Sequence, residues 1–132
     1  MSTEYAPVNR EDYEEVRVFL SKNGWAHRVV DPERLVKMLD NSDRVIVAWD
    51  AGQIVGFARA LCDEVSNGLI SMVAVAEDRR GQGIGREMVQ RLMGEDLNIT
   101  WTLRAGRGSE GFWQKMGFTT SEIAMERTRQ NR

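Results

Sequence analysis

An apolar stretch that runs directly into three closely spaced glycines is the feature that most restricts how this chain can fold. The stretch LISMVAVA (69–76) is apolar and partly β-branched, which is typical of a buried strand. The segment after it, EDRRGQGIGRE (77–87), contains Gly81, Gly83 and Gly85. Apolar residues then recur at helical spacing, at Ile84, Met88, Val89 and Leu92. We therefore expect a strand that enters a helix through a glycine turn whose backbone is accessible.

The rest of the chain alternates between short apolar runs and turn residues. The other expected strands are 5–8, 44–49, 54–61, 98–103 and 118–126. The other expected helices begin after Asn9, Asp31 and Ser109. Turns at 50–52 and 66–68 predict antiparallel hairpins, whereas a strand–helix–strand crossover makes strands 69–76 and 98–103 parallel. The pattern predicts an α/β (α+β) fold with a mixed, mostly antiparallel sheet and helices on both faces, in which strand 69–76 is buried on both sides.

Composition narrows the class of protein. For 132 residues we expect one domain spanning 1–132, in which residues 127–132 form a frayed tail. The chain has 18 basic and 20 acidic side chains and a net charge of −2, so no nucleic acid partner is expected. It has no apolar run near the roughly 20 residues of a membrane span and no apolar secretion signal. The single Cys62 excludes an internal disulfide. We expect a cytoplasmic protein with no membrane partner and no metal.

The glycine segment has the features of an anion site. A helix N-terminus carries unpaired N–H groups and about half a positive charge, and Arg80 and Arg86 add positive charge nearby. A P-loop needs G-x-x-x-x-G-K-[ST], and the required lysine and hydroxyl residue are missing here. A dinucleotide fingerprint needs G-x-G-x-x-G in a βαβ unit, which this segment matches only weakly. A phosphate or diphosphate is the expected ligand.

Two segments resemble motifs of the GNAT superfamily of acyl-CoA-dependent N-acetyltransferases. Arg80, Gly83 and Gly85 satisfy the family's acyl-CoA-binding motif, [R/Q]-x-x-G-x-[G/A]. Further along the chain, GFWQKMGF (111–118) resembles the family's FYEKLGF segment. The two motifs stand in the family's order, and the expected order of strands and helices is similar to the family fold along nearly the whole chain.

The resemblance implies an enzyme that transfers an acetyl group from acetyl-CoA, its co-substrate, to a primary amine of a small molecule or peptide by direct attack on the thioester. In this family two parallel strands splay apart around the pantetheine arm, so the main chain of Val73 and Val75 is expected to bind it. The diphosphate is expected at Arg80, Gly81, Gln82, Gly83, Ile84, Gly85 and Arg86. Phe112, Trp113 and Lys115 are expected to flank the far end of the arm and its sulfur. The resemblance also suggests a homodimer.

The groups that move protons are less well defined. A base must take a proton from the attacking ammonium, and some family members carry a glutamate early in the strand before the glycine motif. That strand has no carboxylate here, which leaves Glu64 or Asp63, at the end of the previous strand, or His27, the only histidine. A tyrosine often protonates the departing sulfur in the family, but Trp113 stands at the matching position, and an indole is no useful acid.

These departures keep a second hypothesis open, a non-catalytic acyl-CoA-binding or sensing module of the same fold. A third hypothesis is a nucleotide-binding or protein-interaction domain without a role for CoA. Both family motifs belong to the donor side, so the acceptor is not defined by the sequence.

Overall fold

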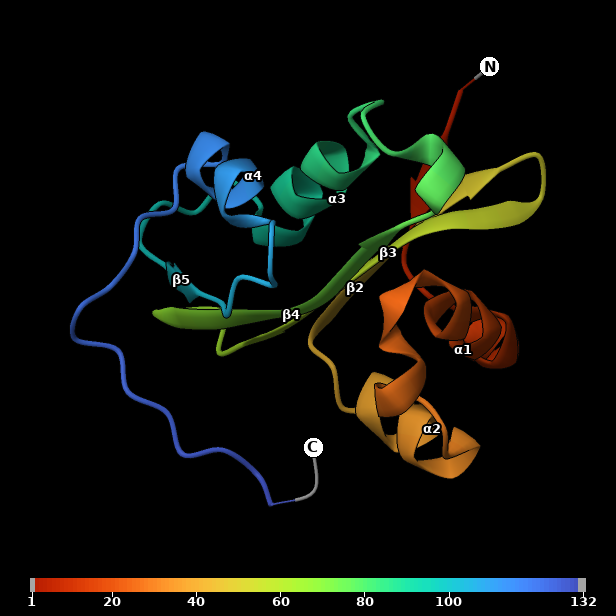
Figure 1. Cartoon of the computed structure of the whole chain (residues 1–132), viewed down its shortest axis with the longest axis horizontal. Helices are drawn as coiled ribbons and strands as arrows, with labels where there is room; N and C mark the ends of the chain where they lie inside the picture. Colours follow the sequence, from red (N-terminus) through yellow and green to blue (C-terminus); the bar gives the residue numbers. More distant parts are fainter. Residues whose placement is uncertain (1, 131–132) are drawn as a thin grey trace.

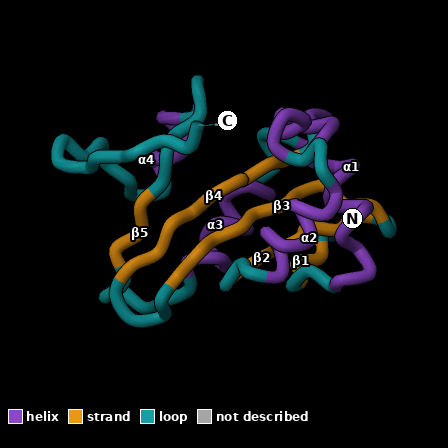
Figure 2. The backbone as a smooth tube through the Cα atoms, turned by 90° about the horizontal axis from the view of Figure 1, so that it is seen from below, coloured by secondary structure: helices purple, strands orange, loops and turns teal. Residues whose placement is uncertain are grey.

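The computed structural model describes residues 2–130 and contains one five-stranded sheet in the order β1-β2-β3-β4-β5. The strands are β1 (Glu4–Ala6), β2 (Arg44–Asp50), β3 (Gln53–Cys62), β4 (Asn67–Val75) and β5 (Thr100–Thr102). All neighbouring strands are antiparallel except β4 and β5, which are parallel. The sheet confirms the mixed, mostly antiparallel arrangement that the turns and the crossover predict (Figure 2).

Helices cover both faces of the sheet, as predicted (Figure 1). They are α1 (Tyr13–Leu20), α2 (Pro32–Asp40), α3 (Ile84–Met93) and α4 (Glu110–Lys115). The first two pack with Phe57 and Met72 in one core, and the last two pack with Ala58 and Ile70 in a second core. We call the two sides of the sheet the α1/α2 face and the α3/α4 face.

Local turn chemistry fixes the ends of the first two helices. The Asp31 side chain accepts the N–H of Glu33 at 3.0 Å, and Pro32 takes the first helical position of α2. The first helix is shorter than expected because an irregular turn, Ser21–Trp25, follows α1. Gly24 in this turn has a φ of +95°, a left-handed value that ends the helix. The turn lies against β4 and contributes residues to the groove described below.

The expectation that strand 69–76 is buried on both sides is wrong. Ile70 and Met72 are buried, whereas Leu69 is 40% exposed and Ser71 is only partly buried. The reason is that neither α1 nor α2 packs over the α1/α2 face of the first half of β4. One side of this strand is therefore accessible.

The expected strand 118–126 does not form, and residues 118–130 contain neither strand nor helix. Phe118 donates its N–H to the Trp113 carbonyl at 3.0 Å, which completes the end of α4 instead of opening a strand. Ile123 and Met125 are 90% and 96% exposed, so no neighbouring strand covers them. Figure 1 shows the segment as a long loop that swings away from α4. Of the expected tail 127–132, residues 131 and 132 lie outside the described residues.

No helix within residues 2–130 is long and apolar enough to cross a membrane.

Candidate active site

Strands β4 and β5 separate part-way along their length. Their last pair joins Leu69 to Thr102, where β5 ends, while β4 continues to Val75. Figure 2 shows β5 beside only the first part of β4. Beyond the last pair the gap is a groove of about 1200 Å³, lined by β4, by residues 103–109, by the start of α3, by α4 and by residues of the segment 23–28. The expected splayed pair is present, and it creates a site inside the sheet.

A β-bulge at Met72 lies where this groove opens. Ala58 pairs with Val73 and Arg59 pairs with Ser71, so Met72 has no partner on β3. Its φ is +70°, a left-handed value that non-glycine residues rarely adopt, although its side chain is only 3% exposed. Side chains of a strand alternate between the two faces of the sheet, and the extra residue shifts this alternation by one position. Ser71 therefore lies on the α1/α2 face and Val73 on the α3/α4 face. Methionine has no preference for this backbone conformation, so the sequence did not predict the bulge.

The main-chain groups of Val73 and Val75 point into the groove. Ala76 donates its N–H to the Val55 carbonyl of β3 at 2.9 Å. Alternate residues of an antiparallel strand face the same neighbour, so Ala74 also faces β3, and Val73 and Val75 face the gap. In the gap, Arg80 Nε donates to the Val75 carbonyl at 3.3 Å. The far half of β4 therefore presents a strand edge to an extended ligand.

The glycine turn, residues 80–86, lies at the end of this strand edge. Gly81 and Gly83 have φ values of +81° and +86°, which explains why glycine occupies both positions. Gly83 is the N-cap of α3, and the first helical bond runs from the Glu87 N–H to the Gly83 carbonyl at 3.0 Å. The N–H groups that precede this bond and lack an intrahelical acceptor belong to Ile84, Gly85 and Arg86. A Cβ at Gly81 or Gly83 would meet no atom within 4 Å, so the space there is open.

A partly buried ion pair anchors the turn to the sheet. Arg79, just before the turn, pairs with Asp50, the last residue of β2, which is 6% exposed. The hydrogen bond to Asp50 raises the pKa of Arg79. The start of the turn is thus tied to the hairpin between β2 and β3, which holds the N-terminus of α3 at the groove.

Positive charge dominates the groove. Apart from His27, the ionisable residues that line its described part are all arginine or lysine, namely Arg28, Arg79, Arg80, Arg86, Arg104, Arg107, Lys115 and Arg129. Arg104 pairs with Glu126 at 2.9 Å, but neither Glu126 nor Asp50 lines the groove. Residues 2–130 contain no group of three or more His, Cys, Asp or Glu side chains that could hold a metal ion. The arrangement favours an anionic ligand.

Comparison with known proteins identifies the family. Residues 9–129 match the family model described as "Acetyltransferase (GNAT) domain". The chain belongs to the GNAT family. It is accordingly an enzyme, an acyltransferase, which removes the hypothesis of a nucleotide-binding or protein-interaction domain unrelated to this family.

Individual relatives agree with the family assignment. A protein of Prochlorococcus marinus described as "Uncharacterized N-acetyltransferase ycf52-like" is 30% identical over 122 residues, which cover 87% of this chain and 67% of that protein. The ycf52 N-acetyltransferase of Gracilaria tenuistipitata var. liui is 31% identical, with 86% of this chain and 63% of the relative covered. This chain thus spans about two thirds of the length of either relative. A solved Staphylococcus aureus structure described as "Probable Acetyltransferase" has a TM-score of 0.80, 18% identity and coverage of 97% and 100%, which shows the same fold.

The GNAT groove brings together most of the residues expected on the donor side. Those that line it are Val73, Val75, Arg80, Gly81, Gly83, Ile84, Gly85, Arg86, Phe112, Trp113 and Lys115. Gln82 is exposed and does not line the groove. Trp113 is 8% exposed and packs edge-on against Phe112 and Phe118, with ring centroids 4.9 and 5.5 Å away. Its indole is therefore part of the core as well as of the groove wall.

The two catalytic candidates lie in different places. His27 lines the groove, stacked on Trp25 with ring centroids 6.4 Å apart. Glu64 does not line the groove and instead pairs with Arg44 at 2.6 Å. The hydrogen bond from Arg44 lowers the pKa of Glu64, which makes this carboxylate a weaker base. The structure therefore does not support Glu64 as the base, because it stands in the turn at the paired end of β4.

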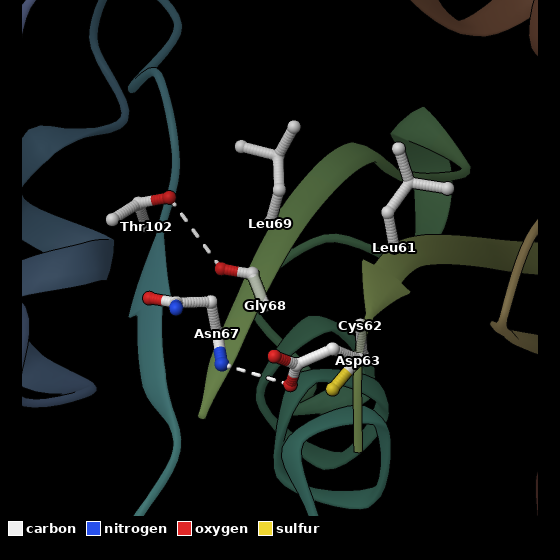
Figure 3. Close-up of a pocket in the computed structure, with 7 residues that line it drawn as sticks. All are labelled: Leu61, Cys62, Asp63, Asn67, Gly68, Leu69 and Thr102. Atoms are coloured by element: carbon white, nitrogen blue, oxygen red, sulfur yellow. Dashed lines mark hydrogen bonds between the residues drawn. The ribbon is translucent and has the colours of Figure 1, made fainter. Parts of the chain in front are cut away.

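Asp63, the other acidic candidate, stabilises that turn (Figure 3). It accepts the Ser66 hydroxyl at 2.7 Å and the N–H groups of Val65 and Asn67 at 2.9 and 3.0 Å. The Ser66 hydroxyl, followed by these N–H groups, holds the pKa of Asp63 well below its usual range. Asp63 borders a smaller hollow of about 310 Å³ at the paired end of β4 and β5, where the Thr102 hydroxyl reaches the Gly68 carbonyl at 3.4 Å. Its role here is structural.

Proposed function

We propose that this GNAT domain transfers an acetyl group from acetyl-CoA to a primary amine of a small molecule or peptide by direct attack on the thioester. The observation that carries the proposal is the continuity of one groove, in which the edge of β4 at Val73 and Val75 leads to the free N–H groups of the glycine turn. An extended arm that ends in a diphosphate requires these two features in this order.

The residues present fit the chemistry of acetyl-CoA. The backbone of Val73 and Val75 would pair with the amides of the pantetheine arm. The N–H groups at the start of α3 would bind the diphosphate, with Arg80 and Arg86 supplying positive charge. The open space in front of Gly83 is where a diphosphate needs to approach the backbone. Side chains at this point would obstruct that approach.

The attacking amine must be neutral, although a lysine-like amine has a pKa of about 10.4. The arginines around the groove disfavour an ammonium ion, which would lower the pKa of a bound amine. His27 would accept the remaining proton, directly or through water. The attack places negative charge on the thioester oxygen, and the N–H of Val73 would stabilise that charge.

The departing sulfur does not need a dedicated acid. A thiol has a pKa of about 8.5, so a thiolate is a tolerable leaving group near neutral pH. Trp113 stands where the family often has a tyrosine, and its buried ring is held by aromatic neighbours. We therefore propose that it shapes the wall of the groove and that the sulfur takes its proton from water.

Replacing His27 with glutamine is expected to lower kcat at pH 7 by about tenfold or more, because loss of a general base typically costs that much or more. The loss should shrink as the pH rises toward the pKa of the amine, where the free amine no longer needs a base. Initial rates from pH 6 to pH 10 measure this. Glu64→Gln is the control and should retain at least half of the wild-type kcat; a larger loss in Glu64→Gln than in His27→Gln would contradict the assignment.

The proposed reaction is tested by following free thiol release from acetyl-CoA over a panel of primary amines, with mass spectrometry of the products. Amine-dependent release together with an N-acetylated product is the expected result. Tight binding of CoA with no turnover on any amine would contradict the proposed reaction, and the absence of CoA binding at millimolar concentration would contradict the assignment of the groove.

Sedimentation of the same protein would test the homodimer suggested by the family resemblance.

A further inference from the structure

We propose that the acceptor amine also carries a carboxylate or a phosphate, and that an arginine cluster made of Arg28, Arg59 and Arg129 binds this anion. The inference names the substrate class of the proposed acetyl transfer and rests on that function. The positive charge concerned lies on the α1/α2 face of the sheet, away from the glycine turn.

Arg59 is a buried cation on this face. It lies on β3 two residues after Phe57, which packs in the core with α1 and α2, and it is only 9% exposed. Its Nε donates to the Ser42 hydroxyl at 2.6 Å, and Ser42 donates in turn to the Met38 carbonyl at 2.6 Å. Within residues 2–130, no Asp or Glu forms an ion pair with Arg59. A buried charge without a counter-ion is costly, so an anion supplied by a ligand would stabilise this site.

Two other arginines add to the charge around Arg59. Arg28 and Arg129 both line the groove. Burial lowers the pKa of Arg59, and the charges of Arg28 and Arg129 lower it further, so both guanidinium groups lie within electrostatic range of Arg59. An arginine stays protonated even when its pKa is lowered. An anion bound beside Arg59 would offset both the cost of burying this guanidinium and its repulsion by neighbouring positive charge.

Arg59 itself does not line the groove, and the cluster reaches the groove through Arg28 and Arg129, near the bulge of β4. Arg59 pairs in register with Ser71, and the bulge places Ser71 on the same face as Arg59. Ser71 lines the groove, as do Leu69 and His27. An anion bound here would lie on the opposite face of the sheet from the glycine turn, and therefore at a site different from the one proposed for the diphosphate. His27, the proposed base, directly precedes Arg28 in the sequence.

This arrangement selects a class of acceptor. A guanidinium group binds carboxylates and phosphates through charge-assisted, often bidentate hydrogen bonds. An amino acid, an aminoalkyl phosphate or an amino-sugar phosphate places such an anion a few bonds from its amine. Polyamines and lysine-rich peptides would meet only positive charge along the groove. The amine of an anionic acceptor would then be held near Ser71 and Val73, beside the proposed thioester position.

Matched pairs of amines test the inference. Glycine is compared with glycinamide, O-phosphoethanolamine with ethanolamine, and glucosamine 6-phosphate with glucosamine, with spermidine as a polycation. For the full chain and acetyl-CoA, we expect kcat/KM to favour the anionic member of at least one pair by about tenfold or more, which is the usual worth of a hydrogen bond to a charged group. Each pair is also titrated calorimetrically into the protein saturated with CoA, so that binding is measured without turnover.

Arg59→Met removes the charge and keeps most of the buried side-chain length, so it is the principal variant. The preference for the anionic member should fall to within about threefold in Arg59→Met, while the affinity for CoA stays unchanged. Arg91→Met, on α3 and outside the groove, is the matched control and should keep the preference. Arg129→Gln, at an exposed position, gives the same test in the event that Arg59→Met does not fold, and its preference should also fall.

The outcomes separate this inference from the proposed function. Turnover that is equal for both members of every pair, or that favours spermidine, would overturn the anionic acceptor and leave acetyl transfer intact. If CoA binds and no amine is acetylated, the proposed reaction fails, and the titrations alone decide the inference. Equal binding of anionic and neutral members, or a preference that both arginine variants retain, would then overturn it.

Discussion

Aspartate in place of Gly83 is expected to weaken the binding of coenzyme A by about a hundredfold or more while α3 still forms. Gly83 is the N-cap of α3 with a φ of +86°, and aspartate tolerates left-handed backbone better than most residues and is a good N-cap. Its carboxylate would stand at the N–H groups proposed for the diphosphate. Two unit charges at 4 Å repel by about 4 kcal/mol at an effective dielectric of about 20, and a hundredfold loss needs only about 2.8 kcal/mol. Isothermal titration calorimetry with coenzyme A measures the change.

Asparagine at the same position is the control for charge. It has nearly the same shape and a similar tolerance of positive φ, so Gly83→Asn carries the same obstruction without the charge and should lose at least about tenfold less affinity than Gly83→Asp. Valine would be a poor probe, because a β-branched residue at a φ of +86° strains the backbone whether or not a ligand binds. Affinities of both variants equal to that of the wild type would show that the diphosphate does not bind at this turn.

Alanine in place of Gly68 is expected to lower the free energy of unfolding by about 1–3 kcal/mol, the usual range for overpacking. A Cβ at Gly68 would lie 2.2 Å from Cζ3 of Trp101, and two more ring atoms lie within 2.7 Å. The ring cannot move freely, because the Arg44 guanidinium lies over it, 5.3 Å from its centroid, and Arg44 also bonds to Glu64 and to the Leu92 carbonyl of α3. Chemical denaturation at pH 7 measures the loss.

Gly111→Ala is expected to raise the free energy of unfolding in the same assay, whereas Gly68→Ala lowers it. Gly111 lies in α4 with no atom within 4 Å of its Cβ position, so alanine should raise stability by about 0.4–1 kcal/mol through helix propensity and a more restricted unfolded chain. If the clash with the indole is the cause, shortening the ring in Gly68→Ala/Trp101→Leu should recover part of the loss, as a double-mutant cycle would show. A Gly68→Ala variant as stable as wild type would contradict this account of the paired end.

Much of the fold follows from sequence because its signals are local. Gly81 and Gly83 indicate turn positions with a left-handed backbone, and Asp31 followed by Pro32 indicates the start of α2. The parallel pairing of β4 with β5 follows from the handedness of the crossover through α3. These features depend on a few neighbouring residues, and the structure has each of them as predicted.

The features that shape the two sides of the groove depend on distant residues. Met72 adopts positive φ because β3 pairs on both sides of it, and methionine gives no sign of this. Arg59 lies in an apolar run, and its hydrogen-bond partner, Ser42, stands 17 residues away in the sequence, just after α2. Residues 118–126 have the composition of a strand, but a strand requires a partner edge, and β5 does not pair with them. Pattern alone cannot reveal such pairings.

The inserted residue at Met72 divides β4 into two segments, and the order in which side chains alternate between the two faces of the sheet is reversed from one segment to the other. Each segment serves a different half of the groove. Substitutions at Leu69 and Ser71 would leave Val73 and Val75 in place, since the contribution proposed for these two residues is made by the main chain. Such a strand allows specificity to diversify at one end while the chemistry inherited at the other end stays constant. Redesign of the acceptor preference should therefore begin with the residues before the bulge and with their neighbours on β3.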